Sequence, residues 1–247
     1  MMKNYKFTVA YDGSRFHGFE KQPNVEMTIQ GKLESVLSIM TDSKVEVIGA
    51  GRTDAGVHAR AMICNAHLET DKSENEIRDY MNHYLPDDIC ICEVKEASDR
   101  FHARYKATGK TYVYTCYIGD IKPIFNRKYV YVLNRKPDIN KMQEAAKYLI
   151  GSHDFKSFCG NPKMKKSTVR EIDKIEIVSK GSYLTLSFHG TGFLQNMVRI
   201  LTGTLLEVGW GKKNVEDIPD IIEAKDRQAA GFTAPAIGLC LMKVDYN

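Results

Sequence analysis

The sequence predicts an α+β fold made of two ferredoxin-like halves, each with the element order β-α-β-β-α-β. Hydrophobic spacing is the first observation: period-two runs and helical-period runs follow one another in that order over residues 5–94 and again from 128 onward. Size is the second, because 247 residues, 43% of them hydrophobic, can bury two small cores. We place the halves at residues 1–105 and 106–247, with their antiparallel sheets joined around a central cleft.

In the first half, strands and helices are marked by spacing and by capping residues. Phe7 and Val9 belong to a period-two run, and Ser73 with Glu76 forms a capping box whose helix Pro86 ends. The expected elements are a strand over 5–11, a helix with apolar residues from Ile29 to Met40, strands near 44–50 and 61–68, a helix after Ser73 and a strand over 89–94.

In the second half, the similarity to the first lies in element order, because no sequence repeat is visible. The stretch 151–167, which contains Asn161-Pro162, is expected to be irregular. The other expected elements are strands over 110–118 and 128–133, a helix opened by Pro137-Asp138, strands near 169–178 and 182–189, a helix from Phe193 to about Val208, a short helix near 215–224 and a strand from Leu239 to Tyr246.

Charge is unevenly distributed, although the formal net charge is only +4. Between Arg100 and Lys136 there are nine Lys or Arg and one acid, Asp120, which is the pattern expected for a surface that meets a polyanion. The six cysteines show no zinc-type spacing, so we expect reduced thiols and no metal site. No signal peptide and no membrane-length apolar run is seen, which predicts a soluble, cytoplasmic protein.

The loop centred on Asp54 is the strongest candidate site. Three glycines surround Arg52, Thr53 and Asp54, and strand-like runs flank the loop on both sides. An arginine two residues away favours the ionised carboxylate, which suits a nucleophile or a base. A turn in which Asp54 only bonds backbone groups is an equal alternative at this stage.

Two further residues could act with Asp54. Tyr112 and Tyr114 share one face of a strand in basic surroundings, which suits stacking on a base, although a core aromatic pair fits as well. Arg199 lies in an apolar helical run and needs a carboxylate partner, for which Asp54 is the attractive choice. A structural ion pair with another acid, or an arginine extending to the surface, is the alternative.

At this point the motifs resemble those of a known family. The run from Gly51 to Ala59, Gly-Arg-Thr-Asp-Ala-Gly-Val-His-Ala, is similar to the signature of the TruA family of tRNA pseudouridine synthases. Four further segments agree in order: Tyr11-Asp12-Gly13 with Gln22-Pro23-Asn24; Phe101-His102-Ala103-Arg104 leading to Lys110-x-Tyr112-x-Tyr114; Gly192-Phe193-Leu194-x-Asn196-Met197-Val198-Arg199; and Thr233-Ala234-Pro235-Ala236-x-Gly238-Leu239.

The resemblance implies isomerisation of uridine to pseudouridine at positions 38, 39 and 40 of tRNA, in an RNA-binding cleft, by a homodimer without metal or organic cofactor. It implies that Asp54 is the catalytic residue, that Tyr112 packs on the target base and that Arg199 pairs with the aspartate. Arg52 and Leu239, which lie in the same motifs, are expected to contact substrate.

Two departures from the family pattern leave alternatives open. Phe19-Glu20 stands where the family usually has Trp-Gln, and Val113 and Thr115 replace a more arginine-rich version. A related synthase acting on ribosomal RNA is therefore one alternative. A non-catalytic RNA-binding module built on ferredoxin-like units is a separate one. An acid/base hydrolase would need a second carboxylate with a raised pKa, and the Asp54 loop contains none.

Overall fold

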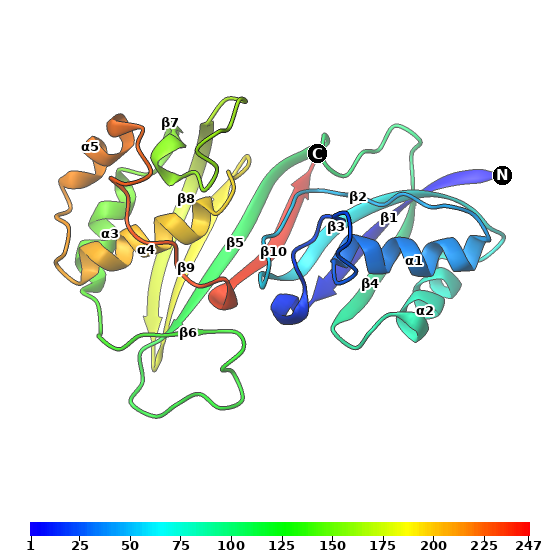
Figure 1. Ribbon diagram of the computed structural model, residues 1–247, viewed down its shortest axis with the longest axis horizontal. Coiled ribbons are helices and arrows are strands. Elements are labelled where there is room, and N and C mark those ends of the chain that lie inside the picture. Colours follow the sequence, from blue (N-terminus) through cyan, green and yellow to red (C-terminus); the bar gives the residue numbers. More distant parts are fainter. The chain divides into compact units, whose positions relative to one another are not determined.

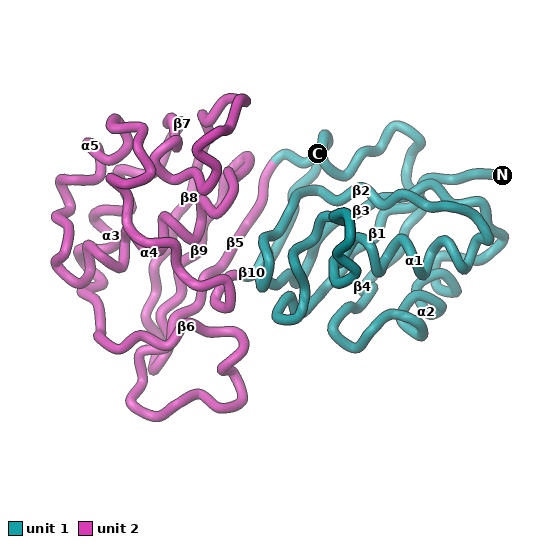
Figure 2. The backbone as a smooth tube through the Cα atoms, in the orientation of Figure 1, with its two compact units in different colours: residues 1–108, 240–247 teal, residues 109–239 magenta.

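The computed structural model describes residues 1–247 as two compact units. Unit 1 comprises residues 1–108 and 240–247, and unit 2 comprises residues 109–239 (Figure 2). The first boundary lies close to the 105/106 division drawn from the sequence. The last strand, in contrast, belongs almost entirely to unit 1 rather than to the second half.

Unit 1 has the predicted ferredoxin-like order. Its elements are β1 (Met2–Tyr11), α1 (Ile29–Thr41), β2 (Ile48–Gly49), β3 (His58–Glu69), α2 (Glu74–Tyr84), β4 (Ile89–Ala97) and β10 (Leu239–Tyr246). Strands β4, β1 and β3 are consecutive antiparallel neighbours, β2 pairs antiparallel with β3, and β10 pairs parallel with the first residues of β3. Helices α1 and α2 lie side by side against this sheet (Figure 1).

Both helices of unit 1 begin at side-chain caps and bury one face. Thr28 caps α1 by accepting from the Gly31 N–H, and the capping box at Ser73 predicted from the sequence is present at the start of α2. The buried residues recur at helical spacing, so each helix presents an apolar stripe to the sheet. They include Ile29, Leu33 and Leu37 in α1 and Ile77 and Met81 in α2.

The strand expected over 44–50 is reduced to 48–49. Side chains of α1 take the backbone hydrogen bonds that a neighbouring strand would otherwise satisfy. The Val47 N–H donates to Glu34 Oε1 at 3.2 Å, and the Val47 carbonyl accepts from Gln30 Nε2 at 3.0 Å. The alternating pattern over 44–50 therefore predicted the buried side chains correctly, but it predicted strand pairing for residues that form none.

A buried polar network holds the segment after β4 onto unit 1. Asn4 Nδ2 donates to the Phe101 carbonyl and Asn65 Nδ2 donates to Asn4 Oδ1, both at 3.0 Å. The Ala103 N–H donates to Asn65 Oδ1 at 2.9 Å, and the Tyr246 hydroxyl donates to the Ala103 carbonyl at 2.7 Å. These bonds explain why unit 1 continues beyond the end of β4.

Unit 2 is a second α+β layer structure. Its elements are β5 (Ala107–Tyr117), β6 (Tyr131–Val132), α3 (Ile139–Lys147), β7 (Gly151–Asp154), β8 (Val169–Lys180), β9 (Tyr183–Gly190), α4 (Met197–Gly209) and α5 (Asp217–Ala224). Strands β5, β9, β8 and β7 are consecutive antiparallel neighbours, and α3 packs beside α4 (Figure 1). The α+β class predicted from the sequence is confirmed.

Four details of unit 2 differ from the sequence prediction. The strand beside β9 is β5, so the second copy of the topology begins there, and only 131–132 of the expected strand at 128–133 is formed. The stretch expected to be irregular contains β7 and a 3-10 helix at Phe155–Phe158. Helix α4 begins four residues late because Asn196 has φ 57°, a left-handed conformation that cannot continue a helix.

Membrane-spanning helices are not found, since none is long and apolar enough. All six cysteines are free thiols.

Candidate active site

Asp54 lies in the loop between β2 and β3, and this loop is held by the segment after β1. The Phe19 N–H donates to the Thr53 carbonyl at 3.0 Å, and the Gly56 N–H donates to the Phe16 carbonyl at 3.2 Å. Thr53 is buried, whereas Asp54 is partly exposed. The two backbone bonds bracket Asp54, so the backbone of the loop is held on both sides of this residue.

Two glycines make this close packing possible. A Cβ at Gly13 would lie 2.0 Å from the Val57 carbonyl oxygen. Gly18 has φ +98°, and a Cβ there would lie 2.7 Å from the Thr53 oxygen. Both positions therefore require glycine for two backbone segments to approach each other.

Buried side chains add to this anchoring. His58, the first residue of β3, accepts from the Gly13 N–H through Nδ1 at 3.1 Å, and Asp12 Oδ1 lies 3.2 Å from the same nitrogen. The Tyr11 hydroxyl lies 2.8 Å from Thr53 Oγ1. The loop is thus tied to two strands of the unit 1 sheet.

Arg52 forms an ion pair with Glu20, with 2.6 Å between Nη2 and Oε1, and both side chains are substantially exposed. Glu20 is one of the residues at which this chain departs from the family pattern. The sequence spacing suggested that Arg52 favours the ionised form of Asp54. In the structure Arg52 is also paired with Glu20, a carboxylate that the sequence did not link to this arginine.

Tyr112 and Tyr114 lie on one face of β5 and are both buried. Tyr112 packs edge-on against Phe193, with ring centroids 5.3 Å apart. The Tyr114 hydroxyl donates to the Pro235 carbonyl at 2.7 Å, and burial raises the pKa of this phenol far above its usual range. Tyr114 is therefore a fixed structural donor, and Tyr112 remains the candidate for contact with a base.

Arg199 lies in the first turn of α4, where two neutral oxygens hold its guanidinium. Nε donates to the Ala234 carbonyl at 2.7 Å, and Nη1 donates to Asn196 Oδ1 at 2.8 Å. The Ala234 N–H in turn donates to the Arg199 carbonyl at 3.1 Å. These two acceptors, both in unit 2, therefore orient the guanidinium group of Arg199.

The loop before β10 runs along α4 and leads to Leu239, which is buried at the start of that strand. The Gly231 N–H donates to Thr204 Oγ1 at 2.9 Å, and Arg227 Nη2 donates to Thr233 Oγ1 at 2.9 Å. The motif that the sequence suggested as a rigid binding loop is thus bonded at several points to α4 and its surroundings.

The predicted site residues belong to both units. Unit 2 brings Arg199 together with the Pro235 loop and Tyr114, while Asp54 and Arg52 belong to unit 1. Sequence reasoning missed Asn196 as the residue that positions Arg199, although their spacing of three was a usable signal. It also missed the Tyr11–Thr53 contact, which joins residues far apart in sequence. Nowhere do three or more His, Cys, Asp or Glu side chains gather in a way that could hold a metal ion.

Comparison with known proteins gives a consistent result over the whole chain. A family model described as tRNA pseudouridine synthase matches residues 8–106 and 145–247. The chain is 44% identical over 245 residues to tRNA pseudouridine synthase A 2 of Bacillus cereus (strain ZK / E33L), covering 99% of this chain and 100% of the relative. The same coverage holds for tRNA pseudouridine synthase A of Bacillus sp. (strain KSM-64), at 44% identity, and of Clostridium kluyveri, at 42%.

Among solved structures, a chain of a Cbf5-Nop10-Gar1 complex is similar, with a TM-score of 0.40 and 13% identity over 96% of this chain and 49% of that one. This similarity is too low to support a functional argument.

Proposed function

This chain belongs to the tRNA pseudouridine synthase A (TruA) family and is therefore an isomerase that forms pseudouridine in tRNA; we propose which of its residues perform the reaction and which uridines it modifies. The observation that carries the assignment is the match over nearly the full length of both chains. The relatives are named for tRNA, which does not favour the ribosomal RNA alternative or a non-catalytic RNA-binding module.

The reaction breaks the N1–C1′ bond of uridine, rotates the base and joins C5 to C1′, and the proton on C5 leaves at the end. We propose that Asp54 is the catalytic residue of this reaction. It acts either by attacking C1′ or by removing a proton so that a glycal forms. The base has to leave its stack first, at a cost of a few kcal/mol that contacts with the RNA must offset. The backbone bonds on both sides of Asp54 support this role, because a catalytic carboxylate must be held in place.

Arg199 is our proposed cationic partner of Asp54. Its guanidinium is oriented by Asn196 and the Ala234 carbonyl, which would lower the entropy cost of aiming it at a carboxylate. A cation beside Asp54 favours the ionised form that either mechanism needs.

The remaining contacts with substrate are proposed for Tyr112, Arg52 and Leu239. Tyr112 would pack on the flipped uracil, since aromatic faces hold unstacked bases. Arg52 is exposed and could meet a phosphate, with Glu20 as its partner when RNA is absent. Leu239 would supply an apolar surface beside the base.

We further propose that the modified uridines are those at positions 38, 39 and 40, and that the enzyme is a cytoplasmic homodimer in which one tRNA can touch both subunits. Mapping pseudouridines in tRNA and ribosomal RNA from cells lacking the protein tests the choice of RNA. Loss of pseudouridine from ribosomal RNA with tRNA unchanged would overturn it.

The test of the catalytic assignment is Asp54→Asn, which keeps the shape of the side chain and removes its charge. We expect this variant to bind tRNA nearly as well as the wild type and to release no tritium from 5-tritiated uridine in tRNA transcripts. Asp71→Asn is the matched control, because Asp71 is an exposed acid of the same unit and should react normally. Normal tritium release by Asp54→Asn would remove Asp54 from the mechanism.

A further inference from the structure

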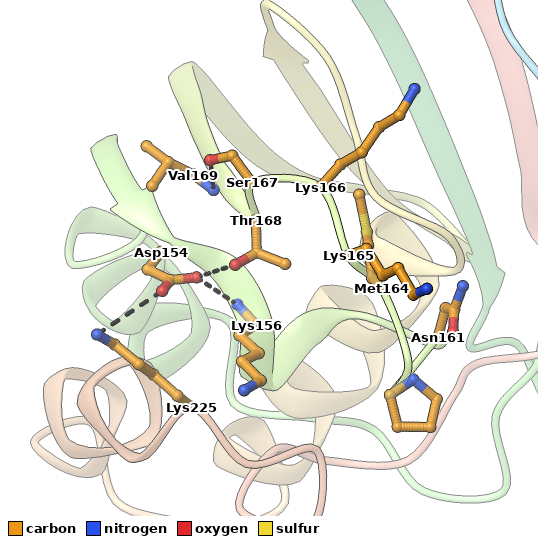
Figure 3. Close-up of a pocket in the computed structure, with 11 residues that line it drawn as sticks. Asp154, Lys156, Asn161, Met164, Lys165, Lys166, Ser167, Thr168, Val169 and Lys225 are labelled. Atoms are coloured by element: carbon orange, nitrogen blue, oxygen red, sulfur yellow. Dashed lines mark hydrogen bonds and ion pairs between the residues drawn. The ribbon is translucent and has the colours of Figure 1, made fainter.

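A basic cavity of about 330 Å³ opens on unit 2, and none of the residues assigned above lines it. Its walls come from the segment between β7 and β8 together with the end of α5 (Figure 3). Four lysines and a single carboxylate line it: Lys156, Lys165, Lys166, Lys225 and Asp154. No aromatic side chain lines it, so the cavity is suited to an anion rather than to a stacked base.

The one carboxylate is already engaged. Asp154 accepts from the Thr168 hydroxyl and from the Lys156 N–H, and its other oxygen lies 3.7 Å from Lys225 Nζ (Figure 3). Lys156 and Lys165, which Figure 3 shows on facing sides of the cavity, form no ion pair. Lys166 forms none either, so four lysines against one carboxylate give the cavity an excess of positive charge.

The lysine-bearing wall is joined to the residues that hold Arg199. The Gly160 N–H donates to the Gln195 carbonyl at 2.8 Å, and a Cβ at Gly160 would lie 2.5 Å from Asn196 Nδ2. Asn196 is the residue whose Oδ1 accepts from Arg199. Within unit 2, the residue next to the cavity lining, Gly160, therefore packs directly against Asn196, which holds Arg199.

We propose that this cavity binds backbone phosphates of the RNA strand that carries the target uridine, with Lys156 and Lys165 as the main contacts. The proposal rests on the proposed function, because it assumes that an RNA strand reaches Arg199. Phosphate contacts fix the register of a nucleic acid without reading its sequence. The cavity would therefore set which nucleotide is presented for reaction, while the reacting atoms are handled elsewhere.

The experiment compares Lys156→Gln/Lys165→Gln with a control pair, Lys141→Gln/Lys180→Gln. The control lysines are exposed, lie in the same unit and do not line the cavity. The dissociation constant for an anticodon stem-loop RNA is measured between roughly 50 and 200 mM KCl. KM and kcat for tritium release are measured on the same RNA, and a Lys156→Arg/Lys165→Arg variant keeps the charges.

We expect Lys156→Gln/Lys165→Gln to reduce the salt dependence of RNA binding. The magnitude of the slope of log K against log[KCl] should fall by about one to two. KM should rise and kcat at saturating RNA should be unchanged, since these lysines do not touch the reacting atoms. The Arg pair should restore the wild-type slope. A slope equal to that of the control pair would overturn the proposal.

Two further arms distinguish an RNA-binding cavity from a site for free anions and from a failure of the proposed function. If inorganic phosphate raises the melting temperature of the wild type but not of the Gln pair, while the RNA slope is unchanged, the cavity is a free-anion site and the RNA proposal is wrong. Wild-type tritium release on the same RNA reports separately on the proposed function. An active wild type with no change in slope overturns only the cavity, and an inactive wild type overturns the proposed function.

Discussion

The Tyr11 hydroxyl lies 2.8 Å from Thr53 Oγ1, and both side chains are buried. Tyr11 is the last residue of β1, a strand with neighbours on both sides, and Thr53 immediately precedes Asp54. This contact links the candidate catalytic carboxylate to the sheet of unit 1 rather than to its own loop alone. A site held by a rigid element keeps its geometry better than one held by a loop.

Tyr11→Phe should therefore weaken both stability and turnover. Removing the hydroxyl leaves Thr53 Oγ1 buried without this partner, which costs about 1–3 kcal/mol of unfolding free energy. We expect kcat to fall with little change in the affinity for tRNA. A double-mutant cycle with Thr53→Val, read by urea denaturation, should give a coupling of about 0.5–3 kcal/mol. Additive effects would show that the two residues do not depend on each other.

Gly18→Ala should destabilise unit 1 and reduce activity. The new Cβ would lie 2.7 Å from the Thr53 oxygen at a backbone φ of +98°. Gly181→Ala is the control, because Gly181 also has a positive φ, +57°, but its Cβ would meet nothing within 4 Å. The control should lose only the conformational term, about 1–2 kcal/mol, whereas Gly18→Ala adds an overpacking cost of about 1–3 kcal/mol. If both variants lose the same unfolding free energy and both release tritium normally, the backbone at Gly18 does not approach Thr53 as closely as described.

The order of elements was predictable from spacing and caps, and the pairing of short strands was not. Periodicity identified β1, α1, α2 and β10 because those segments bury one continuous face. It failed at 44–47, since a backbone bonded to Glu34 and Gln30 buries the same side chains as a paired strand does. The start of α4 was missed because Asn196 adopts a left-handed conformation, which asparagine tolerates but which hydrophobic spacing does not reveal.

For the candidate site, motifs pointed to candidate residues but not to the residues that contact them. The pairing of Arg52 with Glu20 joins two loops, and nothing in the spacing of either loop encodes it. Arg199 is half-buried, and the structure gives it two neutral acceptors that the sequence did not link to it, the Ala234 carbonyl and Asn196 Oδ1. A guanidinium has five N–H donors, so neutral acceptors can hold part of the fork and leave the charge to act elsewhere.

Buried thiols should make stability fall in alkaline solution. Burial raises the pKa of Cys240 to about 11 and that of Cys116 to about 12, from 9.0. Above pH 9 the unfolded chain loses these protons while the folded chain keeps them. The stabilisation is therefore complete below pH 9 and is lost as pH rises towards 11 to 12. The slope is at most about 1.4 kcal/mol per pH unit for each thiol.

Urea denaturation of the wild type from pH 8 upward measures this decline. Cys240→Ala should show a shallower decline, and Cys90→Ala, which removes an exposed thiol, should leave it unchanged. A decline of the same steepness in all three proteins would mean that other groups are responsible.

Arg199 offers the sharpest test of how Asp54 is kept ionised. Arg199→Gln removes the cation and the donor to the Ala234 carbonyl, so the unfolding free energy should fall by about 1.5–3 kcal/mol. The kinetic signature is separate from this loss. If Arg199 stabilises the carboxylate, removing it raises the pKa of Asp54 in the enzyme, and the acidic limb of the kcat profile moves to higher pH.

Arg52→Gln is the matched control, since Arg52 is the other arginine assigned to this site and its ion pair is with Glu20. We expect it to raise KM for tRNA and to leave the acidic limb in place. A loss of stability and rate in Arg199→Gln without movement of the limb would make Arg199 a purely structural residue. If the acidic limb of the kcat profile moves only in Arg52→Gln, then Arg52 rather than Arg199 keeps Asp54 ionised.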